Sequence, residues 1–181
     1  MGLGDHTRRK CFISYHHDDE DEVRQFIQDF DHDQDVLIAR GIGASMAGDI
    51  INSSNEDYIK AKIREKYLRD TTVTIVLVGT CTWARKFVDW EVAASLRNTL
   101  TTSRSGLLAI TLPSASDPDD KQLPARVADN VDSENGYARW WKYPTDASSL
   151  ARLIEIAYEA RNTRAHLVEN TRDLRSYNSS C

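Results

Sequence analysis

The segment TTVTIVLVG at residues 71–79 says most about the fold of this chain. From Val73 to Val78 it is β-branched through its centre and apolar at nearly every odd and even position. A strand with that composition is covered on both faces, as the central strands of parallel sheets are. Because parallel strands are joined by crossover helices, the segment predicts a sheet with helices on both of its faces.

The sequence on either side of this strand repeats the same alternation of strand and helix. Helical patterns begin near Asp19, near Lys86 and near Asp146, and Ser53 followed by Glu56 indicates a further helix start. The first of these helices carries apolar residues at i, i+3, i+4 and i+7, which form one stripe. Between the helices lie short apolar runs that predict four further strands, at 11–15, 35–39, 107–112 and 137–143. The order predicts an α/β fold with an open parallel sheet of about five strands.

Composition limits the classes of function. The 181 residues suit one domain, and the net charge of −5 without a basic stripe argues against a nucleic-acid partner. No apolar run approaches the ~20 residues of a membrane span, and no apolar region follows the basic N-terminus, so we expect a cytoplasmic chain. The three cysteines, Cys11, Cys81 and Cys181, are widely spaced without a CxxC motif. They predict reduced thiols and no structural metal.

In open parallel sheets, ligands bind beyond the carboxyl ends of the strands. Here those ends lead into Tyr15–Asp18, Arg40–Asp49, Gly79–Trp83 and the residues after Pro113. Phosphate-binding motifs of the forms GxxxxGK[ST] and GxGxxG are absent, as is the GxSxG nucleophile motif. A phospho-acceptor receiver would need an aspartate at the end of the third strand, where this chain has Val78-Gly79-Thr80.

The acidic run after the first strand has a structural and a functional interpretation. His16, His17 and Asp18 form a weak metal-binding pattern. The favoured interpretation is that Asp18 or Asp19 caps the following helix, whose acidic first turn suits the helix dipole.

Glu91 is the residue of greatest chemical interest. It shares a predicted helical face with Phe87 and Ala94, and a carboxylate on such a face is costly to bury unless it is paired. One hypothesis is an ion pair with Arg85 or Lys86. The other is that the carboxylate lies against a ribose, where it can accept hydrogen bonds from sugar hydroxyls and stabilise the positive charge that develops when a glycosidic bond breaks.

Several stretches resemble a known family. FISYHHDDED at 12–21, DYIKAKIREKYLRDTTVTIVLVG at 57–79 and GTCTWARKFVDWEVAASL at 79–96 look like the TIR-like domains of the bacterial Thoeris anti-phage defence system, of ThsB type. LPARVADN at 123–130 and YARWWKYP at 137–144 are similar to a later region of the same family. The resemblance implies a flavodoxin-like domain over residues 10–162, with an N-terminal extension at 1–9 and a C-terminal helix or tail at 163–181.

The resemblance also implies an activity. Relatives cleave the nicotinamide–ribose bond of NAD⁺ and cyclise the remainder to an isomer of cyclic ADP-ribose, which activates a separate effector. NAD⁺ would then be a substrate rather than a cofactor, with a phage-derived trigger and self-association expected. Glu91 matches the family's catalytic glutamate. The residues expected to bind substrate are Ser14, Tyr15, His16, Arg40, Asp49, Thr80, Trp83 and Arg85.

Two departures and two alternatives accompany this expectation. Arg85 and Phe87 stand where many relatives have serine and tryptophan, and Arg85 would either bind the pyrophosphate of NAD⁺ or pair with Glu91.

One alternative function is a non-enzymatic interaction module, since TIR-like domains also act as assembly surfaces. The other is a phage sensor whose product is not a cyclic nucleotide.

Overall fold

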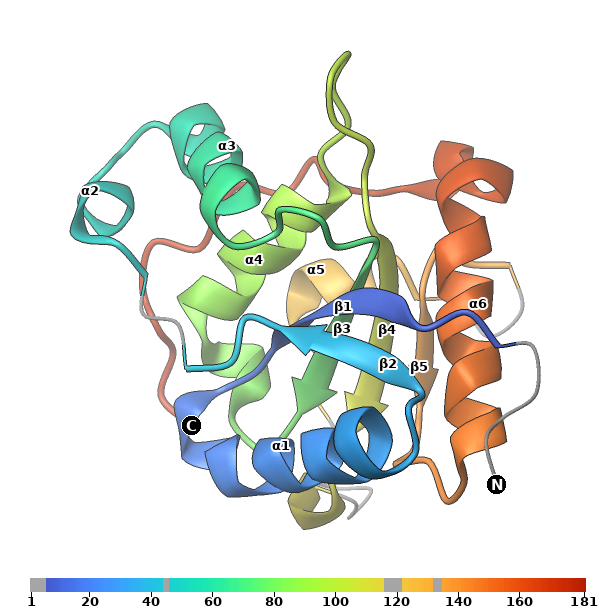
Figure 1. Ribbon diagram of the computed structural model, residues 1–181. Coiled ribbons are helices and arrows are strands. Elements are labelled where there is room, and N and C mark those ends of the chain that lie inside the picture. The colour runs from blue at the N-terminus through green and yellow to red at the C-terminus, as the bar shows by residue number, and fades with distance from the viewer. Residues whose placement is uncertain (1–5, 44–45, 116–121, 132–134) are drawn as a thin grey trace.

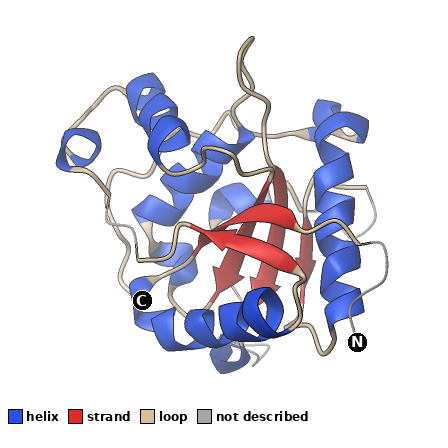
Figure 2. Ribbon diagram, in the orientation of Figure 1, coloured by secondary structure: helices blue, strands red, loops and turns tan. Residues whose placement is uncertain are grey.

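Five parallel strands form one open sheet in the order β2-β1-β3-β4-β5 (Figures 1 and 2). The computed structural model describes residues 6–43, 46–115, 122–131 and 135–181. The strands are β1 (Arg9–Ser14), β2 (Leu37–Arg40), β3 (Val73–Val78), β4 (Gly106–Thr111) and β5 (Arg139–Trp141). Every residue of β3 is buried, as its composition predicted. The predicted α/β parallel sheet of about five strands is confirmed.

The helices cover the sheet on both faces. They are α1 (Glu20–Ile27), α2 (Gly48–Ile51), α3 (Glu56–Lys66), α4 (Lys86–Leu96), α5 (Ala125–Ala128) and α6 (Ala147–Thr163). Helices α1 and α6 pack on the face that carries Val73, Ile75 and Leu77 of β3, while α4 packs on the opposite face with Val76 and Val78. Helix α3 lies outside α4 on that second side (Figure 1). None of the described helices combines the length and apolar composition needed to cross a membrane.

The predicted start of α6 near Asp146 is confirmed, whereas the predicted capping residues of α1 and α3 are wrong. Asp146 caps α6, accepting a hydrogen bond of 2.8 Å from the amide of Ser149. The predicted caps by Asp18 or Asp19 are wrong, because neither side chain bonds to the first turn of the helix. The cap of α3 is Asn55 rather than Ser53. Asp18 and Asp19 instead contact the side chains of His16, His17 and Thr82. The Ser53 hydroxyl accepts a hydrogen bond of 3.1 Å from the amide of Asn55.

Residues 163–181, expected to form a helix or a tail, contain only a short 3-10 helix beyond the end of α6 and then pack against the rest of the chain. After α6 the chain makes one 3-10 turn at Ala165–Leu167, and residues 168–181, which we call the C-terminal strap, then run back across α4 and α5. Leu174 of the strap is buried in the cluster that contains Trp90. The Trp90 indole donates a hydrogen bond of 2.8 Å to the carbonyl oxygen of Arg175.

A buried ion pair lies beneath the strap. The guanidinium of Arg126, which is fully buried, donates to both carboxylate oxygens of Asp89 at 2.8 and 3.3 Å. Two further hydrogen bonds from Arg126 reach the Asn170 side chain and the Asp173 carbonyl oxygen. The backbone amide of Arg175 donates to Asp89 at 2.9 Å. The pair therefore joins α4, α5 and the strap.

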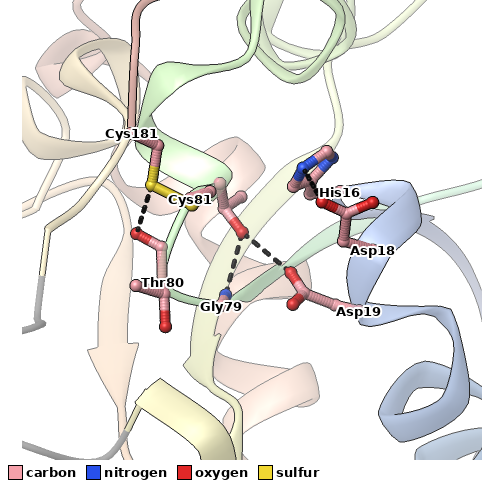
Figure 3. The surroundings of a disulfide bond; sticks show 8 residues. His16, Asp18, Asp19, Gly79, Thr80, Cys81 and Cys181 are labelled. Atoms are coloured by element: carbon pink, nitrogen blue, oxygen red, sulfur yellow. Dashed lines mark hydrogen bonds and ion pairs between the residues drawn. A yellow bond between two sulfur atoms is a disulfide. The ribbon is translucent and has the colours of Figure 1, made fainter.

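The expectation of three reduced cysteines is wrong for two of them. Cys81, in the turn after β3, and Cys181, in the strap, form a disulfide with a Cα–Cα distance of 5.6 Å (Figure 3). They are 100 residues apart in sequence, so only the return path of the strap brings them together. Cys11 is a free thiol buried in the sheet.

Gly106 at the start of β4 tests how closely α6 packs on the sheet. A Cβ added there would lie 2.0 Å from the carbonyl oxygen of Ala157, a backbone atom that cannot move aside alone. We expect Gly106→Ala to lower the free energy of unfolding by about 1–3 kcal/mol through overpacking. Gly48→Ala is the control, because its Cβ would meet nothing within 4 Å. Equal stability of the two variants in urea denaturation would contradict this packing.

Replacing one partner of the buried pair should be far more damaging than replacing one partner of an exposed pair. Arg126→Met leaves the Asp89 carboxylate buried without its cation, which should cost about 3–5 kcal/mol in the free energy of unfolding. The control is Arg172→Met, which breaks the exposed pair with Asp129 at 2.8 Å and should cost about 1 kcal/mol or less. Chemical denaturation measures the free energy of unfolding of both variants. A similar decrease in both would show that the buried pair contributes no more to stability than the exposed pair.

Candidate functional site

A cleft of about 460 Å³ opens at the carboxyl end of β1. The strand order reverses between β1 and β3, and this is where open parallel sheets of this order bind ligands. The cleft lies between the residues that follow β1, the glycine-containing loop after β2 and the first turns of α4. Residues lining it include Phe12, Tyr15, His16, Gly41, Gly43, Met46, Tyr67, Arg85, Phe87, Glu91 and Asn178.

Helix α4 presents one carboxylate to this cleft. From Val88 to Leu96 every residue of the helix is buried except Glu91. Apolar neighbours on the sheet side and on the α3 side hold the helix in place, so the Glu91 side chain leaves the packed region only where the cleft begins. Of the helical face predicted from Phe87, Glu91 and Ala94, the first two residues line the cleft, whereas Ala94 is buried in the cluster that contains Trp90.

Glu91 is held by a hydroxyl group rather than by a cation. The Ser14 hydroxyl, at the end of β1, donates a hydrogen bond of 2.5 Å to Oε2 of Glu91. Burial raises the pKa of Glu91 to about 7, and the bond from Ser14 opposes this rise. A pKa raised toward neutral pH lies in the range in which a carboxyl group is most useful as a general acid or base.

The ion pair that could have occupied Glu91 is absent from the described residues. Arg85 lines the same cleft, and its buried Nε has no hydrogen-bond partner there. Burial, followed by the positive charge of Arg85, lowers the pKa of His16. Lys86 instead lies over the rings of Phe87 and Trp90, at 5.1 and 5.3 Å. The cleft therefore contains a guanidinium group and a separate carboxyl group.

Two tyrosine hydroxyls hold the loop that borders the cleft. The Tyr15 hydroxyl accepts a hydrogen bond of 3.1 Å from the amide of Gly43, and that of Tyr67 accepts one of 2.9 Å from the amide of Ala47. Gly41 has a φ of 86°, and a Cβ there would lie 2.3 Å from the Phe12 ring. Glycine at this position lets the loop approach Phe12 and turn over the cleft.

Five of the nine residues expected at the site come together, namely Ser14, Tyr15, His16, Arg85 and Glu91. The other four lie elsewhere. Arg40 is exposed and donates to the carbonyl oxygen of Ala39. Asp49 faces α3, accepting a hydrogen bond from Tyr58 and pairing with Lys66 at 3.6 Å.

Thr80 and Trp83, in the turn after β3, are not among the residues that line the cleft. Thr80 borders a second hollow together with His16 and several acidic residues. Trp83 is partly buried in a 3-10 turn, and its carbonyl oxygen accepts a hydrogen bond from Arg175. The aromatic side chains that do line the cleft with Tyr15 are Phe12, Tyr67 and Phe87.

The acidic run after β1 is held by its own contacts (Figure 3). Carboxylate oxygens of Asp18 lie 3.1 Å from Nε2 of His16 and 2.9 Å from Nε2 of His17. The three residues each offer an atom that could ligate a metal ion, and these atoms lie within 4.8 Å of one another. Asp19 accepts a hydrogen bond of 3.4 Å from the Thr82 hydroxyl and packs against Gly79. Burial, followed by the charge of Glu22, raises the pKa of Asp19. Asp19 therefore joins the start of α1 to the turn after β3.

The sequence did not predict Phe12, Tyr67 or Asn178 as cleft residues, whereas Met46 lies within the predicted loop Arg40–Asp49. Phe12 and Tyr67 belong to patterns that predict core positions. Asn178 lies in a segment without periodicity, and no sequence signal connects it with α4.

Comparison with known proteins identifies one family. The model for the TIR-like domain of the Thoeris protein ThsB matches residues 12–117, more than half of the chain. The match begins in β1 and continues past β4, so it includes Ser14 and Glu91. No curated protein matches the chain.

The raised pKa of Glu91 predicts a pH-dependent cost in stability. Because folded Glu91 holds its proton more tightly than the ordinary value of 4.5, its protonation favours folding. That contribution is complete below about pH 4.5 and is lost as the pH rises through about 7. Glu91→Gln, which is neutral at all pH values, should match wild type near pH 4 and exceed it by up to about 3 kcal/mol near pH 8.5.

Urea denaturation at both pH values measures this divergence. Glu159→Gln, on an exposed part of α6, controls for the loss of one carboxylate. A constant difference between Glu91→Gln and wild type from acid to alkaline pH would show that the pKa of the Glu91 carboxyl group is not raised in the folded protein.

Proposed function

The chain belongs to the family of TIR-like domains of the Thoeris protein ThsB, and from this premise we propose that it cleaves the nicotinamide–ribose bond of NAD⁺. Membership places the chain in anti-phage defence. The observation that carries the chemical proposal is Glu91, a carboxyl group hydrogen-bonded to Ser14, without a cationic partner among the described residues, in the cleft where the strand order reverses.

The cleavage step needs charge stabilisation more than it needs an acid. The C1′–N bond of the nicotinamide riboside breaks, and its electron pair goes to the ring nitrogen, so a cationic ring leaves as neutral nicotinamide. The ribose is left as an oxocarbenium ion. The Glu91 carboxylate would accept hydrogen bonds from the ribose hydroxyls and stabilise this cation, with Ser14 holding its orientation.

The rest of the cleft supports the binding of a dinucleotide. Arg85 supplies a guanidinium group that suits the pyrophosphate. Phe12, Tyr15, Tyr67 and Phe87 supply rings for a base and for nicotinamide. These walls would also exclude water, so that a nucleophilic atom of the same nucleotide, rather than water, captures the oxocarbenium ion and releases a proton.

In this proposal the product is an isomer of cyclic ADP-ribose. It would carry the signal to a separate effector protein, and a phage-derived component would trigger its synthesis. We also propose self-association of the chain on activation. NAD⁺ is the substrate, and the reaction as written needs no further cofactor.

The test is the fate of NAD⁺ in infected cells that express the chain. Wild type should release nicotinamide and form a product with the mass of cyclic ADP-ribose, measured by chromatography and mass spectrometry. Glu91→Gln should lower both by roughly 100-fold or more, because the charge that stabilises the cation is lost. Glu159→Gln should behave as wild type, and urea denaturation should show that every variant is folded.

Two results would overturn the proposal. Undiminished nicotinamide release by folded Glu91→Gln would remove the carboxylate from the reaction. Protection against phage without any loss of NAD⁺ would favour a non-enzymatic interaction module. A product with the mass of ADP-ribose would retain the cleavage step and exclude cyclisation.

A further inference from the structure

The end of the C-terminal strap completes the amino terminus of α4. The first amides of a helix have no partner within it, and Arg85, the residue before α4, provides no side-chain cap. Asn178 supplies one from the strap, because its Oδ1 accepts a hydrogen bond of 2.9 Å from the amide of Lys86. The cap of the helix that carries Glu91 thus comes from 92 residues further along the chain.

The same part of the strap forms a wall of the cleft. Asn178 lines the cleft together with Arg85 and Glu91. Beside it, the amide of Ser179 donates a hydrogen bond of 2.9 Å to the carbonyl oxygen of Ala84. The strap therefore holds the backbone on both sides of Arg85, and the position of that guanidinium group depends on it.

The strap is attached in two different ways along its length. Its first part, through Arg175, is held by buried groups, including Leu174 and the Asp89–Arg126 pair. From Ser176 onward it is mostly exposed, with Ser179 partly covered. The disulfide to Cys81 is the covalent attachment of this exposed end (Figure 3).

The disulfide is open to exchange with external thiols. Cys181 is exposed and Cys81 is partly exposed, so a thiolate can approach the S–S bond. A dithiol reductant attacks one sulfur, forms a mixed disulfide and then closes its own disulfide. The S–S bond of the protein gains two electrons and two protons and becomes two thiols, while the dithiol loses them. Reducing cytosolic conditions supply reductants of this class.

We propose that the Cys81–Cys181 disulfide is a redox-controlled clasp, which holds Asn178 as a positioning residue for α4 and for the wall of the cleft. Oxidation completes the cleft. Reduction releases residues 176–181, uncaps α4 and weakens nucleotide binding. The clasp itself stands on the described contacts, whereas its effect on NAD⁺ rests on the proposed function.

The state of the cysteines is measured first, in the full chain. After oxidation with glutathione disulfide and denaturation, thiol titration should find one thiol, that of Cys11, and after reduction it should find three. Three thiols in the oxidised sample would overturn the proposal.

Hydrogen exchange then tests the clasp without reference to activity. Reduction with dithiothreitol should accelerate exchange in residues 83–90 by about tenfold or more and leave β4 unchanged. Oxidised Cys181→Ser should resemble the reduced wild type. Cys11→Ala keeps the clasp and should respond to the reductant as wild type does. Unchanged exchange in 83–90 after reduction, with the disulfide shown to be open, would overturn the proposal.

Variants of Asn178 separate its role from that of the disulfide. Asn178→Ala keeps the disulfide but removes the acceptor, so oxidised protein should still show faster exchange in 83–90. Asn178→Asp retains an acceptor oxygen and should restore slow exchange. Failure of the aspartate to restore it, with both variants folded, would contradict the assignment of Asn178.

NAD⁺ affinity distinguishes the clasp from the proposed function. Calorimetry with oxidised and reduced protein should show that reduction weakens NAD⁺ binding by about tenfold. Redox-dependent exchange without any NAD⁺ binding would support the clasp and contradict the proposed function. Equal NAD⁺ binding in both forms would support the substrate and contradict the control of the cleft by the clasp.

Discussion

The contact between Asp89 and Arg126 is the constraint on which the candidate site depends. Charges removed from water are costly unless geometry and additional hydrogen bonds compensate them. Here both carboxylate oxygens and most of the guanidinium donors have partners, contributed by α4, α5 and the strap. Asp89 lies two residues before Glu91, so the contact that satisfies the buried charge also sets the rotation of α4 and directs Glu91 toward the cleft.

The sheet supplies the second half of the site. Because β1 lies next to β3, Ser14 at the end of one strand meets the helix that follows the other. This arrangement accepts an energetic penalty at Glu91, where burial disfavours the charged form that the proposed chemistry requires. The free energy gained by packing the apolar residues of α4 offsets this cost at Glu91.

Periodicity and burial explain what could be predicted from the sequence. The apolar β3 and the amphipathic helices determine the parallel sheet, and the helical face of Phe87 and Glu91 is the one that lines the cleft. The disulfide and the strap were not predictable in this way. The strap has no repeat, and its position depends on side chains such as Arg126 and Asn178, whose partners lie far away in sequence. Asp19 was misassigned because its partner, Thr82, is equally remote.

The long separation between Lys86 and Asn178 has a consequence for synthesis of the protein. A ribosome that has just completed α4 has not yet made the side chain that caps it, because Asn178 lies 92 residues after the Lys86 amide that it accepts from. Nascent chains therefore carry Glu91 on a helix whose first turn lacks this partner. The wall formed by Asn178 is assembled only after α4 has been made, so chains released before residue 178 would lack it.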